Sequence, residues 1–275
     1  MRLVNKHVII TGGSSGIGLA TARLLVARGA SVSLIARDRL RLAEAAELLR
    51  PGAHKTGQRV EIATADVSRQ NDIQQAIGAV IQRCGPCDIL ITSAGAAHPG
   101  YFEQLDDAVF REMMEVNYFG TLYAIRAVVP QMIARRSGTV VAIASVAGLI
   151  GMFGYTAYAP AKFAVRGLME SLHQELKPYN IAVSIAYPPD TDTPQLAYEN
   201  QFKPAETARI SGTIKPISAD KMARALVRGI LKRRFHITAD PQSALLVRLA
   251  GVATPMLYRK FDRAISQARR ERGAT

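Results

Sequence analysis

A tyrosine and a lysine four residues apart, Tyr158 and Lys162, are the pair in this chain best suited to acid–base chemistry. If a helix begins near Tyr158, both side chains lie on one face of it. An ammonium group beside a phenol favours the phenolate and lowers a phenol pKa that is ordinarily about 10. Ser145 follows the apolar run 140–144, typical of a buried parallel strand, so we expect its hydroxyl at the carboxyl edge where ligands bind. This pattern indicates a catalytic site more strongly if a nucleotide-binding site lies upstream in the sequence.

A glycine-rich turn near the N-terminus predicts such a nucleotide site. The apolar run 7–11 is typical of a strand, the turn GGSSGIG at 12–18 follows at once, and an amphipathic stretch covers 19–28. Strand, glycine-rich turn and helix start form the arrangement that holds a dinucleotide pyrophosphate on backbone amides. The residues expected to contact the cofactor here are Gly12, Ser14, Ser15, Gly16, Ile17 and Gly18.

The spacing Gly-x-x-x-Gly-x-Gly, combined with Tyr158-x-x-x-Lys162, resembles the short-chain dehydrogenase/reductase family over roughly residues 6–193. The resemblance implies that Ser145 and Tyr158 hydrogen-bond a ketone oxygen and that Tyr158 donates the proton. It implies that Lys162 also holds the nicotinamide ribose, while Asn117 holds a water that relays protons to Lys162. No metal ion takes part in this scheme.

The same resemblance implies further cofactor contacts. Asp66 and Val67 are expected at the adenine, and Thr193 at the nicotinamide carboxamide. Ser93 replaces an asparagine that is usual in the family, and Pro189 replaces a glycine. The other residues expected to contact the cofactor are Ala94, Gly95, Pro188 and Thr191.

The end of the second expected strand favours NADPH over NADH. Folds that prefer NAD usually place a carboxylate there for the ribose 2′-hydroxyl, but this chain has Ala36 followed by Arg37. Arg37 suits a 2′-phosphate, and Arg41, one helical turn further, could close a second side of it. Asp38 is the nearest carboxylate and lies beyond the usual position. The alternative is that both arginines are solvated residues at a helix start.

Segments around the expected substrate resemble one subgroup of the family, the 3-ketodihydrosphingosine (3-ketosphinganine) reductases. The segments are 153–158, 175–180, 187–194 and 199–204, and the likeness fades after about residue 211. The subgroup implies NADPH-dependent reduction of a long-chain lipid ketone, 3-ketosphinganine, to sphinganine. Two alternatives stay open: a reductase of another long-chain or steroid ketone, and a non-catalytic NADPH-binding scaffold.

Apolar strands alternate with helical stretches, which predicts an α/β fold: a single-domain, Rossmann-like, doubly wound parallel sheet. We expect strands at 8–11, 31–36, 60–64, 89–93, 139–145, 182–186 and 235–238. Helices are expected at 17–28, 39–49, 73–83, 106–135 and 158–176. The reductase domain would span 1–240, with a substrate lid at about 190–217, and a basic, partly apolar tail would span 241–275.

The net charge of +13 is concentrated at the C-terminus, where the sequence from Lys221 onward contains thirteen basic residues and only three acidic ones. With the apolar stretch 244–258, this indicates an anionic membrane surface as partner. A solvated basic face and a contact with a second subunit are the alternatives. No zinc spacing or RNA-binding signature accompanies the charge, so we expect no nucleic acid partner.

The sequence contains no run of about 18 uncharged apolar residues, so we expect no membrane-spanning helix. The first expected strand begins within a few residues of the N-terminus, which leaves no room for a signal peptide. We therefore expect a cytoplasmic protein, peripheral on the cytoplasmic face of a membrane. Family precedent implies a homo-oligomer with the helices at 106–135 and 158–176 in the interface.

The two cysteines form Cys84-Gly-Pro-Cys87, the tetrapeptide of thioredoxin active sites. A redox cysteine gains acidity at a helix N-terminus, but Cys84 is expected at a helix C-terminus, where a thiolate is disfavoured. We therefore expect no redox function.

Overall fold

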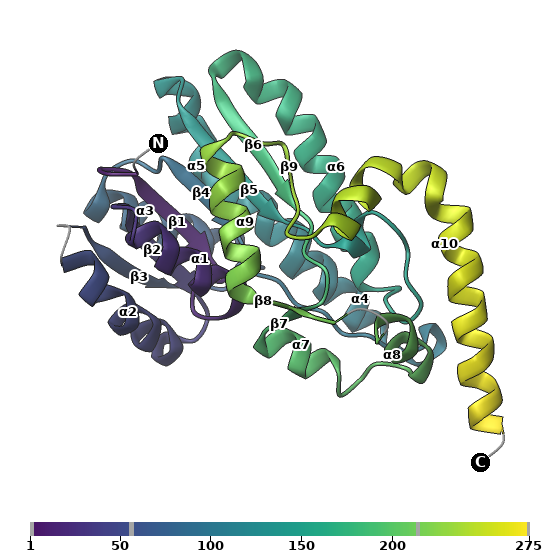
Figure 1. Cartoon of the computed structure of the whole chain (residues 1–275). Coiled ribbons are helices and arrows are strands. Elements are labelled where there is room, and N and C mark those ends of the chain that lie inside the picture. The colour runs from purple at the N-terminus through teal and green to yellow at the C-terminus, as the bar shows by residue number, and fades with distance from the viewer. Residues whose placement is uncertain (1–2, 55–57, 213–214, 274–275) are drawn as a thin grey trace.

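Seven strands form one parallel sheet at the centre of the structure, a computed structural model that describes residues 3–54, 58–212 and 215–273 (Figure 1). The order across the sheet is β3-β2-β1-β4-β5-β6-β9, and every neighbouring pair is parallel. Short apolar runs without alternation suit strands that are covered on both faces. The strands are β1 (His7–Thr11), β2 (Ser31–Ala36), β3 (Val60–Thr64), β4 (Ile89–Thr92), β5 (Gly138–Ile143), β6 (Ile181–Ala186) and β9 (His236–Ile237).

Helices cover both faces of this sheet (Figure 1). On one face lie α1 (Gly16–Val26), α2 (Arg39–His54) and α9 (Ala219–Leu231), which share an apolar core with the strands. On the other lie α3 (Gln70–Cys84), α5 (Gly120–Arg135) and α6 (Tyr158–Leu176), with a second core. The predicted doubly wound, Rossmann-like fold is confirmed, and the predicted strand ends differ from the observed ones by at most two residues.

The direction in which strands are added to the sheet reverses beside β1. The chain places β2 and β3 on one side of β1, and then places β4 on its other side. In open α/β sheets, ligands bind at such a reversal, outside the carboxyl ends of the strands. The segments that follow β1, β4 and β5 therefore meet at one edge, and these segments carry most of the predicted site residues.

The predicted helix at 106–135 is interrupted. It consists of α4 (Asp107–Met113), a π-helical stretch η2 (Met114–Phe119) and α5. The Asn117 Nδ2 group in η2 donates to Met113 O, four residues back, at 2.9 Å. A side chain that takes up an i−4 carbonyl competes with the regular backbone ladder, and π segments often accompany functional positions. Short 3-10 turns complete this part of the chain: η1 (Phe102–Gln104), η3 (Val146–Gly148) and η4 (Lys177–Tyr179).

After β6 the chain forms a small substructure beside the sheet edge. It contains the parallel pair β7 (Thr191–Asp192) and β8 (Ile217–Ser218), with α7 (Pro194–Glu199) and α8 (Ala205–Ser211) between them. The predicted lid at 190–217 falls on this substructure, except that 213–214 lie outside the described residues.

The described part of the predicted tail is one helix, α10 (Pro241–Gly273), and residues 274–275 lie outside the described residues. Pro255 lies inside this helix and does not end it. The helix packs beside α8 and extends away from the sheet (Figure 1). Arg269 Nε lies 3.6 Å from Glu206 Oε1, and Arg209 pairs with Glu271. Within the described ranges, no helix combines the length and apolar character needed to cross a bilayer.

Candidate active site

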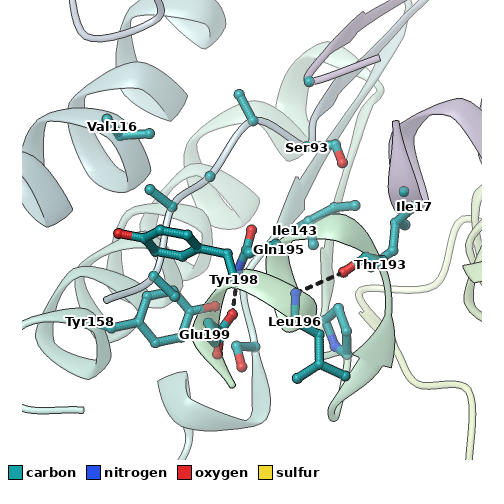
Figure 2. Close-up of a pocket in the computed structure, with 18 of the residues that line it drawn as sticks. Ile17, Ser93, Val116, Ile143, Tyr158, Thr193, Gln195, Leu196, Tyr198 and Glu199 are labelled. Carbon is teal, nitrogen blue, oxygen red and sulfur yellow. Dashed lines mark hydrogen bonds between the residues drawn. The ribbon is translucent and has the colours of Figure 1, made fainter. Parts of the chain in front are cut away.

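A cavity of about 790 Å³ opens at the carboxyl ends of the strands and joins the predicted cofactor and catalytic residues (Figure 2). Its walls come from the segments after β1 to β6 and from α4, η2, α6 and α7. Two predicted residues, Gly18 and Asn117, are not among those that line it. The predicted residues that do are Gly12, Ser14, Ser15, Gly16, Ile17, Arg37, Arg41, Asp66, Val67, Ala94, Gly95, Ser145, Tyr158, Lys162, Pro188, Thr191 and Thr193.

The glycine-rich turn has the shape that a dinucleotide pyrophosphate requires. Gly12 has φ +68° and Gly16 has φ +52°, a region that favours glycine. A Cβ on Gly12 would lie 2.5 Å from Ala94 N, and one on Gly18 would lie 2.2 Å from Gly12 O. Gly18 therefore serves the packing of α1 against the turn. Ser15 gives α1 no side-chain cap, which leaves the amides of its first turn for an anion.

The end of β2 fits a 2′-phosphate better than a ribose 2′-hydroxyl. Asp38 Oδ1 accepts the backbone amides of Leu40 and Arg41 at 3.0 and 3.1 Å, and its Oδ2 lies 3.5 Å from Arg41 Nε. The carboxylate is thereby committed to the start of α2. Arg37 and Arg41 are exposed and line the cavity.

Tyr158 and Lys162 lie in the first two turns of α6, as predicted. Both are buried, with 8% and 4% of their surface exposed. Lys162 Nζ lies 5.5 Å from the centroid of the Tyr158 ring and donates to Ile143 O, the last residue of β5, at 3.1 Å. Ser145, two residues beyond β5, accepts from Ala147 N at 3.1 Å and so caps η3. The phenol, the hydroxyl and the ammonium group therefore meet at one wall of the cavity.

The pKa of Tyr158 is raised in this structure, whereas the sequence predicted a lowered one. Burial raises the pKa of Tyr158, and the negative charge of Glu199 raises it further, while hydrogen bonds with Ser145 and Gln195 oppose both effects. Burial also lowers the pKa of Lys162 to about 8. Desolvation is the largest cause of both shifts, which the sequence spacing could not show.

Asn117 lies outside the cavity wall and holds the segment after β4. Its Nδ2 donates to Ala96 O at 2.9 Å, and its Oδ1 accepts from Ala96 N at 3.3 Å. A Cβ on Gly95 would lie 2.9 Å from Asn117 Oδ1 and 3.5 Å from Lys162 Nζ, so only glycine fits between them. The water relay through Asn117 stays a prediction.

Two predicted cofactor contacts near α7, Thr191 and Thr193, form hydrogen bonds to the protein backbone through their hydroxyls. Thr193 caps α7 by accepting from Leu196 N at 3.3 Å, and it donates to Thr191 O at 3.1 Å. Thr191 Oγ1 donates to Pro189 O at 2.8 Å. A Cβ on Gly16 would lie 3.1 Å from Thr193 Cγ2, which shows that the start of α7 and the glycine-rich turn stand close together.

Two predicted adenine contacts lie after β3. Asp66 Oδ1 accepts from the amide and the hydroxyl of Ser68 at 3.0 and 2.8 Å. Val67 is buried, and a Cβ on Gly120 would lie 2.8 Å from its Cγ2. Both residues line the cavity.

Three cavity residues escaped the sequence-based assignment of roles. Glu199 ends α7 with only 7% of its surface exposed. Tyr155 donates to its Oε2 at 2.8 Å, and Gln195 Nε2 donates to its Oε1 at 2.9 Å. Burial raises the pKa of Glu199. Its place in the segment 199–204, which resembles the subgroup, was the only signal that pointed to it.

The two cysteines have no redox features. Cys84 is the last residue of α3, as predicted, and burial raises its thiol pKa. Cys87 is fully buried, and burial raises its pKa to about 12. Neither thiol is activated as a thiolate.

Comparisons with known proteins agree with this geometry. The family model of the short chain dehydrogenases matches residues 6–204. The chain is 40% identical to a 3-dehydrosphinganine reductase of Danio rerio and 39% identical to a 3-ketodihydrosphingosine reductase of Dictyostelium discoideum. These matches cover 93% and 95% of this chain, and 77% and 82% of the two relatives.

Solved structures share the fold as well. A short-chain dehydrogenase from Sphingobium yanoikuyae, in complex with NADPH, superposes with a TM-score of 0.77 at 28% identity, over 92% of this chain and 95% of that one. The glycine-rich turn, the Ser145, Tyr158 and Lys162 wall and these matches lead to one conclusion: the chain belongs to the short-chain dehydrogenase/reductase family.

Proposed function

We propose that this protein reduces 3-ketosphinganine to sphinganine with NADPH, as a step in sphingolipid biosynthesis. The observation that carries the proposal is that the nucleotide turn, two exposed arginines and the Ser145–Tyr158–Lys162 wall meet in one cavity. The names of the relatives in Danio rerio and Dictyostelium discoideum support this choice of substrate. Apolar side chains beside the catalytic wall suit an alkyl chain; they include Val109, Met113, Val116 and Met152.

NADPH fits the cofactor half of the cavity. The amides at the start of α1 would bind its pyrophosphate, Arg37 and Arg41 its 2′-phosphate, and Lys162 the nicotinamide ribose. When bound, NADPH supplies a hydride to the carbonyl carbon of a ketone.

The chain itself supplies the proton that balances that hydride. The Ser145 and Tyr158 hydroxyls hydrogen-bond the ketone oxygen, where negative charge grows during the reaction. Tyr158 then gives its proton to that oxygen and is left as a phenolate, which the charge of Lys162 stabilises. The buried wall excludes water, which strengthens both interactions.

The direct test is NADPH oxidation by the purified protein with and without 3-ketosphinganine. Turnover that requires this ketone, with sphinganine as product, is the expected result. Turnover only with other long-chain or steroid ketones would keep the chemistry and replace the substrate. NADPH binding without turnover of any ketone would indicate a scaffold and contradict the proposal.

Replacing Arg37 with alanine should raise the KM for NADPH about 10- to 100-fold, because a charge-assisted hydrogen bond contributes about 1.5–3 kcal/mol. The KM for NADH should change little, since NADH lacks the 2′-phosphate. Steady-state kinetics with both cofactors measures the difference. Equal losses for both would show that Arg37 does not bind the 2′-phosphate. Arg39, which is also exposed but does not line the cavity, gives the matched control variant Arg39→Ala.

The region 190–217 acts as a lid over the substrate in this proposal. Its first helix, α7, brings Thr193 beside Gly16 and Glu199 beside Tyr155, so it borders both halves of the cavity.

The protein forms a homo-oligomer through α5 and α6, where Phe163 is 41% exposed. Light scattering of the wild type and of Phe163→Glu tests this, and a monomeric wild type would contradict it.

We further propose that α10 binds an anionic membrane on its cytoplasmic side, where a long-chain substrate resides. Leu245, Leu249 and Met256 are exposed by 58%, 43% and 62% and recur at helical spacing on one face. Exposed basic residues border this stripe, namely Arg248, Arg259, Lys260 and Arg263. An apolar stripe with basic flanks suits the interface of a bilayer.

Binding to anionic vesicles should be reversible and weaken with salt, because each basic residue near the surface contributes about 1 kcal/mol that salt screens. Changing Arg259, Lys260 and Arg263 to glutamate should abolish sedimentation with vesicles of phosphatidylserine and phosphatidylcholine. Turnover of a detergent-dispersed substrate should persist in this variant. Binding that does not depend on lipid charge would contradict the proposal and favour an oligomer contact.

A further inference from the structure

Glu199 is a buried carboxylate that the transfer of hydride and proton does not require. It lies on the wall of the catalytic cavity, at the end of α7, and points to the same space as Tyr158 (Figure 2). Placing a carboxylate in a buried site costs free energy unless hydrogen bonds and an opposite charge compensate it. A buried acid beside the reacting atoms therefore needs a partner.

The protein supplies hydrogen bonds to Glu199 but no ion pair. Tyr155 and Gln195 are neutral donors that fix the two carboxylate oxygens at 2.8 and 2.9 Å. Lys203 is one nearby cation that acts on its charge, yet Lys203 Nζ lies 3.1 Å from Asp190 Oδ2 and is paired there. Among the side chains that the structure describes, no basic group lies within ion-pair distance of Glu199. Lys162 acts on Glu199 through space without an ion-pair contact, so the carboxylate remains open to pair with a cationic group of a ligand.

The proposed substrate carries such a charge at the right place. 3-Ketosphinganine has an ammonium group on the carbon next to its ketone, so the two groups are separated by a single carbon–carbon bond. The ketone oxygen lies at Tyr158, whose ring centroid is 5.7 Å from that of Tyr155, and the Tyr155 hydroxyl reaches Glu199. An acid on this side of Tyr158 would lie beside the substituent of the carbon next to a ketone held by Tyr158.

We propose that Glu199 binds the ammonium group adjacent to the ketone and thereby selects 2-amino ketones over simple ketones. This assignment rests on the proposed function and specifies how that site recognises its substrate. Tyr155 and Gln195 are positioning residues, because they orient the carboxylate and do not contact the reacting atoms.

The pairing has a second effect, on the acid itself. The charge of Glu199 raises the pKa of Tyr158 and so makes it a poorer proton donor. A substrate ammonium group beside Glu199 cancels that field, whereas an amine-free ketone leaves it in place. The correct substrate therefore improves the acid that reduces it, which adds to the preference for amino ketones.

The test compares two ketones of equal chain length, 3-ketosphinganine and 1-hydroxyoctadecan-3-one, which lacks the amine. Glu199→Gln keeps the size of the side chain and an oxygen that can accept from Tyr155. It should lower kcat/KM for the amino ketone about 10- to 100-fold, the range for a lost charge-assisted hydrogen bond, mainly through KM. For the amine-free ketone, kcat/KM should stay the same or rise.

Asp192→Asn is the matched control, because Asp192 is an exposed acid on the same segment that does not line the cavity. This substitution should leave kcat/KM unchanged for both ketones. If Glu199→Gln lowers kcat/KM equally for both ketones, Glu199 has a purely structural role. If kcat/KM is unchanged for both ketones, the inference is also overturned.

Calorimetry on the NADPH complex gives a readout that does not depend on turnover or on a variant. The wild type should bind dodecylamine at least about tenfold more tightly than dodecanol, and Glu199→Gln should remove most of this preference. Equal affinity of the wild type for the two ligands would contradict the inference even if Glu199→Gln fails to fold. Failure of the proposed function looks different, because the wild type would then not oxidise NADPH with 3-ketosphinganine at all.

Discussion

Replacing Tyr158 with phenylalanine should lower kcat about 10²- to 10⁴-fold, the usual contribution of a positioned general acid. The substitution removes only the hydroxyl, so the buried ring keeps its packing against Tyr155 and the wall of the cavity. The Kd for NADPH should change little, because Lys162 and the glycine-rich turn remain. Stopped-flow measurement of NADPH oxidation and a fluorescence titration of NADPH separate the two effects.

A second buried tyrosine provides the matched control. Tyr187 is fully buried, and within the described part of the chain its hydroxyl has no hydrogen-bond partner and does not line the cavity. Tyr187→Phe removes the same atom at no cost in hydrogen bonds, so kcat should stay at the wild-type value. A Tyr158→Phe enzyme that turns over as fast as Tyr187→Phe would rule out Tyr158 as the proton donor.

Replacing Lys162 with methionine should impair both cofactor binding and catalysis. The KM for NADPH should rise about 10- to 100-fold, because hydrogen bonds from a charged group contribute about 1.5–3 kcal/mol. kcat should fall as well, since the phenolate left after proton transfer loses its nearby positive charge. A fall in kcat with unchanged affinity for NADPH would show that Lys162 does not hold the nicotinamide ribose.

The same variant has a predictable effect on stability. Burial lowers the Lys162 pKa from 10.5 to about 8, which corresponds to a cost of about 3 kcal/mol for the charged form in the folded state. The cost is fully present below pH 8 and is lost as the pH rises through 10.5, above which the lysine is neutral in both states. The stability of Lys162→Met relative to the wild type should therefore decrease by about 3 kcal/mol between pH 7 and 10.5. Urea unfolding at a series of pH values measures it.

The sequence was sufficient for features that depend on local pattern. Apolar runs located the strands, and β2 and β3 begin and end at the predicted residues. The glycine-rich turn was recognisable because Gly12 and Gly18 leave no space for a Cβ, a requirement that acts on residue type directly. α6 begins at Tyr158, which placed Lys162 one turn further on the same face.

Features that depend on burial could not be predicted from the local sequence pattern. The pKa of Tyr158 is governed by desolvation and by Glu199, 41 positions away in the sequence, so spacing to Lys162 gave the opposite direction. Glu199 itself looks like an ordinary surface acid until α7 is packed against Tyr155. The π stretch in 106–135 depends on where the side chain of Asn117 finds its acceptors.

The contact between α10 and α8 ties the end of the chain to the substructure that also carries α7. Glu206 on α8 is 1% exposed; it accepts from the Tyr101 hydroxyl at 2.8 Å and faces Arg269 on α10. α8 and α10 should therefore open together as one cooperative unit in native-state hydrogen exchange, with similar opening free energies. A bilayer that held α10 would suppress this opening, so lipid vesicles should protect the amides of α8 even though α8 does not touch the lipid.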